Sequence, residues 1–448
     1  MIKTAITGTW RFAVYLLMIA VFISIGYFTA RENFLQLFVL YSAAFGLYIV
    51  LLKYADNEDL VKEGRYLGLF LRFVLLFNVP NLTDDFYRFI WDGKLLLNGI
   101  NPYAFSPEQI ALDNVHHTNL TNVVDTHLFD ELNSKQYFTI YPPVCQFLFS
   151  SAAFLSFNNE YVNIVLLKFF IFMFEVGTIL LLPKLLVQLK MPVKYQLIYT
   201  LNPLIILELT GNMHFEAIMV FFLVLSIYFL LKQQDIFSAI VFGFAIGSKL
   251  WPVMLLPLFF KFIGFRRTIQ FCLISGATAL IILLPMFLQY KNIVGSLNLY
   301  FQQFEFNASS YYLFRFLIGK DEHYDTFLLM RKLLPIITIL TITALSIFYK
   351  KQYFLSALLL TFSLYCLFAT TIHPWYLSPL IILSVFSPYR YAIIWSFLIY
   401  LSYITYITPA YLENYYLIVL EYVIVIGYFI YEMQIKRRMK NIIRANSQ

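Results

Sequence analysis

The feature that most constrains this chain is a series of apolar segments, each about 20 residues long, along almost its whole length. A helix needs about 20 mostly apolar residues to cross a bilayer, where only helices and closed barrels satisfy their backbone hydrogen bonds. Runs of this kind predict spanning helices at residues 12–29, 34–52, 65–79, 161–182, 215–231, 268–288, 333–348, 353–369, 391–407 and 415–431. Shorter or broken runs lie at residues 142–157, 195–209, 237–262 and 375–386. We therefore predict an all-α polytopic membrane protein with about 12–14 transmembrane helices.

The composition excludes other classes of protein. Of the 448 residues, 60% are hydrophobic and 13% are charged, whereas a soluble domain carries about 25% charged residues. The net charge of +7 does not indicate a nucleic-acid partner, because the clearest basic cluster, in residues 436–444, directly follows the last apolar segment. Three widely spaced cysteines predict neither a disulfide framework nor a metal site. The partners expected from composition are membrane lipids.

The distribution of lysine and arginine predicts which loops face the cytoplasm. Basic clusters at residues 53–65, 261–267, 350–351 and 436–444 indicate cytoplasmic loops by the positive-inside rule. Residues 81–140 and 291–330 then lie outside. Lys184, Lys190 and Lys194 also fit a cytoplasmic loop, which requires residues 142–157 to be re-entrant and not spanning.

This orientation divides the chain into six parts. They are N-terminal transmembrane helices at 1–80, an outer loop at 81–140, a transmembrane core with broken helices at 141–290, a second outer loop at 291–330, C-terminal transmembrane helices at 331–435 and a basic cytoplasmic tail at 436–448.

The long polar insertion at residues 81–140 begins with an acidic pair, Asp84-Asp85. Apolar residues then recur at helical spacing from Phe86 to Leu97, which predicts an amphipathic helix on the membrane surface. Thr83 or Asp84 would cap its start, placing both carboxylates at a positive helix N-terminus. A plain N-cap is the structural alternative, although it needs only one carboxylate.

Several short motifs follow one another along the chain. They are the loop at residues 82–103, Tyr141-Pro-Pro143, Asn202-Pro-Leu204, Glu208, Gly211-Asn-Met-His-Phe-Glu216, Gly247-Ser-Lys-Leu-Trp-Pro252 and His373-Pro-Trp-Tyr376. In content and order these motifs resemble those of GT-C membrane glycosyltransferases, most closely bacterial polyprenol-phosphate-mannose-dependent mannosyltransferases. More distantly, they resemble the enzyme that adds the first mannose to glycosylphosphatidylinositol.

The resemblance implies a GT-C-like helical bundle and an enzyme that takes its sugar, mannose by resemblance, from a polyprenyl phosphate. A lipid-linked or cell-envelope glycan on the outer face, the periplasmic side of a bacterial inner membrane, would accept the sugar. This reaction needs a carboxylate to accept the proton of the attacking hydroxyl and positive charge on the leaving phosphate. Asp85 or Asp84 would be the base. The other carboxylate would hold a substrate hydroxyl or a divalent cation (Mg²⁺ or Mn²⁺), although an adjacent pair alone does not make a metal site.

Two basic residues are candidate phosphate ligands. Arg88 follows Asp84 by one helical turn, so it either contacts phosphate or forms a salt bridge with that carboxylate. Lys249 lies among apolar residues, where a charge is costly and usually functional. The structural alternative for Lys249 is a side chain that snorkels from a helix end.

Other polar residues would bind the sugar or the phosphate, namely Glu208, His214, Glu216 and His373. The alternatives are a capped helix start at His214 and Glu216 and an interfacial anchor at His373. Glu175 lies within an apolar segment and needs a partner, for which Lys168, seven residues earlier on the same face, is a candidate.

Two other functions fit a polytopic membrane protein: a transporter or flippase of a lipid-linked glycan, and a non-catalytic polysaccharide assembly protein. Transporters also show broken helices with buried charges. The motif-bearing segments, however, have no counterparts in a second half of the chain, and an acidic outer loop suits an enzyme better.

Overall fold

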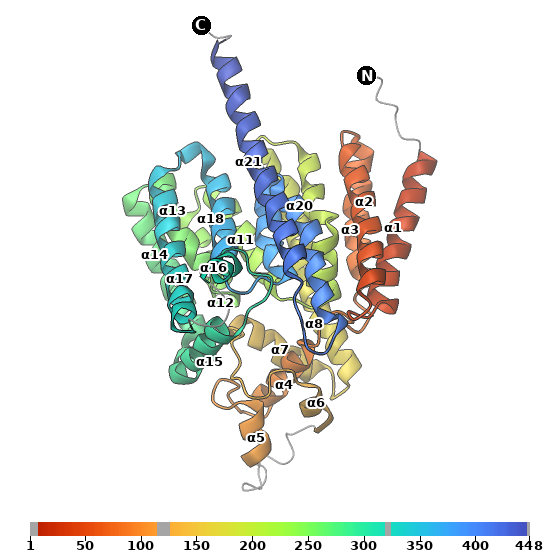
Figure 1. The fold of residues 1–448 in the computed structure, drawn as a ribbon, viewed down its shortest axis with the longest axis vertical. Coiled ribbons are helices and arrows are strands. Elements are labelled where there is room, and N and C mark those ends of the chain that lie inside the picture. Colours follow the sequence, from red (N-terminus) through yellow and green to blue (C-terminus); the bar gives the residue numbers. More distant parts are fainter. Residues whose placement is uncertain (1–7, 114–125, 319–323, 446–448) are drawn as a thin grey trace.

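The computed structural model describes residues 8–113, 126–318 and 324–445, and these residues form helices joined by short loops (Figure 1). In this described part there is no β-strand, only an isolated bridge between Phe306 and Thr371. Seven of its helices are long and apolar enough to cross a membrane, or eight if one bent pair counts as a single span. The prediction of an all-α polytopic membrane protein is confirmed. The predicted count of 12–14 crossings stays a prediction, because it requires apolar helices of 10–17 residues to cross the membrane as well.

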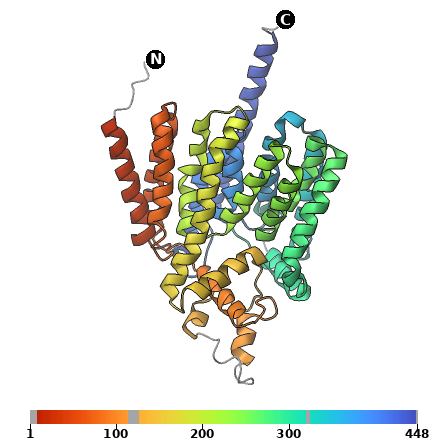
Figure 2. The ribbon, with the colours of Figure 1, turned by 180° about the vertical axis from the view of Figure 1, so that it is seen from behind.

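The N-terminal helices form a group at one side of the bundle (Figures 1 and 2). Asparagine side chains cap the N-termini of two of them. The side-chain oxygen of Asn33 accepts a hydrogen bond from Gln36 N, and that of Asn57 accepts one from Leu60 N. The three helices are α1 (Gly8–Phe28), α2 (Phe34–Lys53) and α3 (Glu58–Val74).

A group of short helices covers one end of the bundle, and we call residues 81–113 and 126–157 the cap. Its helices are α4 (Phe86–Leu97), α5 (Pro107–Asp113), α6 (Thr126–Glu131) and α7 (Pro143–Leu155). Helix α4 has the bounds expected from its periodicity. Figures 1 and 2 place α7 beside α4 and not among the long helices, as the distribution of lysines required. The two helices approach closely at Gly93, where a Cβ atom would lie 2.4 Å from the carbonyl oxygen of Phe149.

The centre of the bundle contains a span that is bent by 117° between Pro203–Gly211 and Glu216–Leu231. Its first half ends in a π-helical turn. The central elements are α8 (Glu160–Gln188), η1 (Val193–Gln196), α9 (Leu197–Thr200), α10 (Pro203–Ile205), η2 (Ile206–Gly211), α11 (Glu216–Leu231), α12 (Asp235–Ser248), η3 (Trp251–Leu255), α13 (Leu256–Ile263) and α14 (Phe265–Phe287).

Two buried charges in α8 have partners on neighbouring segments. Glu175 accepts from Arg72 Nε of α3 at 2.5 Å, and Lys168 donates to the carbonyl oxygens of Leu75 and Asn78. The expected Lys168–Glu175 pair is therefore wrong. Residues seven apart on a helix are separated by about 10 Å along its axis, so each charge is instead paired across a helix interface.

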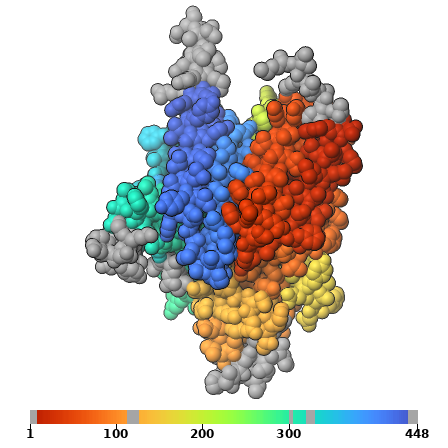
Figure 3. Space-filling view, turned by 45° about the vertical axis from the view of Figure 1, so that its right-hand side comes forward, coloured from red at the N-terminus to blue at the C-terminus, as the bar shows by residue number. Residues whose placement is uncertain are grey.

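The remaining helices close the bundle around the central span. They are α15 (Tyr290–Gln303), α16 (Ser310–Ile318), α17 (Tyr324–Phe348), η4 (Lys351–Tyr353), α18 (Phe354–Phe368), η5 (Pro374–Leu377), α19 (Ser378–Val385), α20 (Tyr391–Leu398), η6 (Ile399–Ile407) and α21 (Tyr415–Ala445). Figure 3 shows the N-terminal helices (red) side by side with the C-terminal ones (blue). Their contact includes the Tyr41 and Tyr400 rings, which stack at 3.5 Å.

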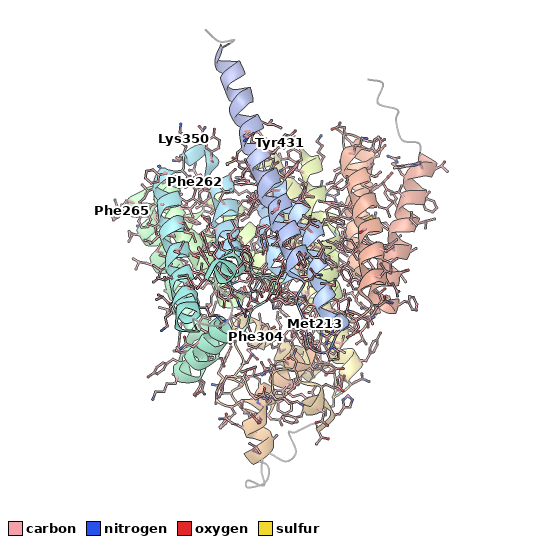
Figure 4. All side chains as sticks on the ribbon, in the orientation of Figure 1. Met213, Phe262, Phe265, Phe304, Lys350 and Tyr431 are labelled. Atoms are coloured by element: carbon pink, nitrogen blue, oxygen red, sulfur yellow. The ribbon has the colours of Figure 1, made fainter. Side chains whose placement is uncertain are left out.

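The two ends of the bundle differ. Figure 4 labels Phe262, Phe265, Lys350 and Tyr431 near one end, which we call the basic end because the clusters at 261–267 and 350–351 lie there. Met213, in the bend of the central span, lies toward the other end, beside the cap (Figure 4). The bend thus lies where the polar cap meets the bundle.

Candidate active site

The acidic pair lies where the cap chain enters α4. Asp85 occupies the N-cap position in an αR conformation, and its side chain makes no capping bond. The Thr83 hydroxyl instead accepts from the backbone N–H of Asp85 at 3.2 Å. The prediction that Thr83 or Asp84 caps the helix is therefore wrong, and neither carboxylate of the pair is used as a cap.

Asn133, from the distal part of the cap, holds the two carboxylates together. Its Nδ2 donates to Asp84 Oδ1 at 2.8 Å and to Asp85 Oδ1 at 3.1 Å. Asp84 has a second partner, since Arg31 Nη2 lies 3.1 Å from its Oδ2. Within the described part of the chain Asp85 pairs with no cation, so it is the less compensated of the two.

The surroundings of Asp85 favour its protonated form. Desolvation, opposed by the Asn133 hydrogen bond and reinforced by the negative charge of Asp84, raises the pKa of Asp85 to about 6. Lys249 acts in the opposite direction, which places that lysine within electrostatic range of the carboxylate. A carboxylate with a pKa near neutrality is suited to general-base catalysis.

The bend of the central span contributes His214 and Glu208. The chain reverses at the buried residue Met213, whose φ of 64° is unusual for a residue other than glycine. His214 Nδ1 lies 2.8 Å from the carbonyl oxygen of Glu208. Because a carbonyl only accepts, Nδ1 carries the proton, and Nε2 of the neutral ring is an acceptor. The Glu208 carboxylate is itself held by Asn212 at 3.2 Å and Tyr403 at 2.9 Å.

Three rings join the bend to the segment that contains His373. Trp375 stacks on His214 with ring centroids 3.7 Å apart and on His373 at 4.5 Å. The ring of Phe306 stacks on His373 at 4.6 Å. Nε2 of His214 and Nδ1 of His373 are buried and have no hydrogen-bond partner among the described residues. Buried polar atoms are normally satisfied, so both nitrogens are candidate ligand contacts.

Lys249 lies where α12 ends and η3 begins. Its Nζ is 2.6 Å from Glu216 Oε1, and it lies over the ring of Trp251 at 5.0 Å from the centroid. It interacts electrostatically with His214 and His373 as well as with Asp85. The side chain is 24% exposed. Lys249 is thus held by a carboxylate and an aromatic ring within the site, and the snorkelling alternative does not describe its contacts.

Arg88 does not face the acidic pair. Its Nε donates to Asp92 at 2.8 Å, and its Nη1 donates to the carbonyl oxygens of Ser134 and Tyr137. The alternative of a salt bridge with Asp84 is wrong, because Arg88 pairs with Asp92 on its own helix. Arg88 therefore joins α4 to the loop that carries Asn133, and its role as a phosphate ligand stays a prediction.

Sequence reasoning did not name Arg31 or Asn133 as parts of the site, and it named Trp375 only within the motif at residues 373–376. Arg31 has the clearest sequence signal of the three, because it is a cation in a turn that the positive-inside rule places on the outer side. Asn133 has no sequence signal, because it lies in a polar loop without periodicity.

The described residues contain no group of three or more His, Cys, Asp or Glu side chains arranged to hold a metal ion. A divalent cation at the acidic pair would share Asp84 with Arg31 and would have to take further ligands from substrate or water.

A sequence model of a protein family, described as "alpha-(1->6)-mannopyranosyltransferase, N-terminal domain", matches residues 17–264. The match spans more than half of the chain and contains the acidic pair, the bend of the central span and Lys249, but not His373. No curated protein and no solved structure shows significant similarity to the chain.

Proposed function

Starting from the fact that this chain belongs to the alpha-(1->6)-mannopyranosyltransferase family, we propose that it transfers mannose from a polyprenyl-phosphate-linked donor to a lipid-linked or cell-envelope glycan. The family is one of mannosyltransferases, so the chain is a membrane glycosyltransferase. The lipid-linked donor, the glycan acceptor and the outer face of the membrane are the new parts of this proposal.

The observation that carries the mechanism is the convergence of Asp85, Lys249 and two histidines at the junction of cap and bundle. The acceptor hydroxyl attacks the anomeric carbon, the bond between that carbon and the phosphate oxygen breaks, and Asp85 takes the hydroxyl proton. Lys249 stabilises the negative charge that develops on the departing phosphate. The acceptor hydroxyl is the nucleophile, so the protein itself need not supply one.

The other polar groups bind and orient the sugar. Nε2 of His214 accepts a hydrogen bond from a sugar hydroxyl, and His373 makes a similar contact through Nδ1, because both atoms are without a partner in the described residues. Glu216 holds Lys249 until phosphate replaces it. Glu208, fully buried, holds the bend that presents His214. The linkage in the family's description suggests a primary 6-hydroxyl as the attacking group.

The location of the site favours a lipid-linked donor. The acidic pair lies at the end of the bundle opposite the basic end, and positive-inside counting makes that end the outer one. Nucleotide sugars do not cross a bilayer, so an enzyme there must use a sugar that is carried across on a lipid. A Mg²⁺ or Mn²⁺ ion at Asp84-Asp85 is a secondary proposal, which loss of activity in a chelator and its recovery with either ion would support.

The decisive experiment incubates the purified protein with a panel of radiolabelled polyprenyl-phosphate sugars and a membrane lipid extract. We expect label to pass from the mannosyl donor to the acceptor fraction, and we expect no transfer by Asp85→Asn. Equal transfer by that variant would overturn the assignment of the base. If no donor is consumed while labelled lipid moves across proteoliposomes, the chain would be a transporter of lipid-linked glycan.

A further inference from the structure

A row of three tyrosines follows one face of η6. A 3-10 helix has about three residues per turn, so side chains three apart lie one above another, and in η6 these are Tyr400, Tyr403 and Tyr406. Their ring centroids are 5.0 Å apart for the first two and 5.6 Å apart for the last two. The row begins in the buried core, where Tyr400 stacks on Tyr41, and it ends at Tyr406, which is partly exposed.

The ring of Tyr406 connects the acidic pair with the segment that contains His373. The guanidinium of Arg31 is 3.1 Å from Asp84 and lies over the Tyr406 ring, 5.2 Å from its centroid. The ring of Phe306, with its centroid 6.1 Å from that of Tyr406, stacks on His373. Tyr406 is therefore the aromatic residue that has neighbours in both parts of the site.

The hydroxyl is the part of Tyr406 that has no partner in the described chain. Tyr403, one turn earlier, donates its hydroxyl to Glu208 at 2.9 Å, whereas the Tyr406 hydroxyl makes no hydrogen bond with a described residue. Of the charged groups around it, Asp85 acts on Tyr406 most strongly. The free hydroxyl thus belongs to a side chain that lies close to the proposed base.

We infer that Tyr406 is a further substrate-binding residue, whose hydroxyl forms a hydrogen bond with the acceptor sugar. This inference rests on the proposed function, because it assigns a contact within the same site. It goes beyond that proposal in giving the acceptor a ligand from the C-terminal part of the chain, outside residues 17–264, which the family model matches.

The chemistry of the transfer step brings the acceptor to this side chain. Asp85 takes the proton of the attacking hydroxyl, so the acceptor sugar must lie within hydrogen-bond distance of that carboxylate. Its other hydroxyl groups are then close to the phenolic oxygen of Tyr406, which can both donate and accept. Arg31, Tyr403 and Phe306 surround the Tyr406 ring, so little side-chain freedom is lost when the sugar binds.

The test varies the two substrates separately in Tyr406→Phe, which loses only the hydroxyl. Transfer is measured with polyprenyl-phosphate mannose as the donor and a membrane lipid extract as the acceptor, each varied against a fixed amount of the other. We expect the amount of extract for half-maximal transfer to rise about 3- to 10-fold, as for the loss of one neutral hydrogen bond. The apparent donor KM should stay the same. Tyr431→Phe, an exposed tyrosine toward the basic end (Figure 4), is the matched control and should keep both values.

Thermal unfolding in detergent separates substrate binding from a structural role. The midpoint of Tyr406→Phe should equal that of the unmodified protein, because phenylalanine keeps a ring beneath the Arg31 guanidinium. A lowered midpoint, or failure of the variant to insert, would mean that the hydroxyl serves the fold and would contradict the inference.

Two kinetic outcomes would also overturn the assignment to the acceptor. Half-maximal transfer at an unchanged amount of extract would show that the hydroxyl makes no acceptor contact. A rise in the donor KM equal to or larger than the rise for the extract would show that it contacts the donor. Absence of transfer by the unmodified protein, or equal transfer by Asp85→Asn, would instead defeat the proposed function itself.

Discussion

Asp84 and Asp85 are neighbours in sequence, but the tertiary structure gives them different partners. Arg31 and Asn133 donate to the two oxygens of Asp84, whereas one oxygen of Asp85 accepts no hydrogen bond from the described residues and its pKa is raised. A similar argument applies to His214, because the carbonyl of Glu208 fixes its proton on Nδ1 and leaves Nε2 as an acceptor. At the scale of single residues, the hydrogen-bond partners of each polar atom determine which atoms remain for contact with a substrate.

Asp85→Asn should lower the transfer rate by about 100-fold or more, as expected for loss of a general base. Asp84→Asn should retain measurable transfer, because an asparagine oxygen still accepts the hydrogen bond from Asn133. Transfer rates of both variants, normalised to the amount of inserted protein, give the comparison. Loss of activity in Asp84→Asn alone would reverse the assignment.

The pH dependence of the wild-type enzyme provides a second check on Asp85. This carboxylate must be ionised to accept a proton, and its pKa is raised to about 6. We therefore expect kcat/KM to fall as the pH drops through about 6. Above that pH, where Asp85 is ionised, kcat/KM should reach a plateau. A limb centred near pH 4 would show that a carboxylate with an ordinary pKa acts as the base.

Lys249→Ala should weaken use of the donor, because the phosphate would lose its cationic contact. The apparent KM for the polyprenyl-phosphate donor should rise about 10-fold or more, with Lys249→Arg as the charge-preserving control. An unchanged apparent donor affinity in Lys249→Ala would restrict this lysine to its ion pair with Glu216.

At the level of elements, the site depends on how the cap is joined to the bundle. Helix α4 packs on α7 at Gly93, and its Phe89 ring contacts Phe215 of the bend at 5.2 Å. On the opposite side, Phe306 exchanges backbone hydrogen bonds with Thr370 and Ile372, next to His373. These two junctions bring Asp85 and the two histidines within electrostatic range of Lys249.

Gly93→Ala should disturb the junction of α4 and α7. Its Cβ would lie 2.4 Å from a backbone carbonyl, which can move away only if one helix shifts. We expect a loss of about 1–3 kcal/mol, the usual cost of overpacking, together with lower transfer activity. Gly46→Ala is the matched control, because its Cβ meets nothing within 4 Å. Thermal unfolding in detergent measures both, and equal midpoints would contradict the close approach.

On the scale of the whole molecule, polarity is sorted between the two ends. The cap and the bend of the central span lie together at one end, and the lysine-rich turns lie at the other (Figure 4). Buried pairs such as Arg72–Glu175 join neighbouring helices between these ends. The proposed orientation in the membrane uses this sorting, because the positive-inside rule assigns the basic end to the cytoplasm.

Cysteine labelling tests this orientation directly. A membrane-impermeant maleimide should label Glu131→Cys in intact cells, because that exposed residue lies in the cap. Lys350→Cys, exposed at the basic end, should be labelled only after permeabilisation. Two of the native cysteines, Cys145 and Cys366, are buried, and the unmodified chain serves as the control for Cys272. The reverse pattern would place the site on the cytoplasmic face.

The sequence by itself determined the membrane class, the amphipathic helix Phe86–Leu97 and the residue types of the site. Long apolar runs have one stable state in a bilayer, and helical periodicity is a local property, so neither needs knowledge of the fold. The tertiary structure decided which partners meet: Arg31 with Asp84, Arg88 with Asp92, Arg72 with Glu175, and Trp375 with His214. In a helical bundle such contacts depend on which helices become neighbours, and spacing along one helix does not contain that information. The different partners of Asp84 and Asp85 therefore follow from the fold, because Arg31 comes from the turn between two other helices.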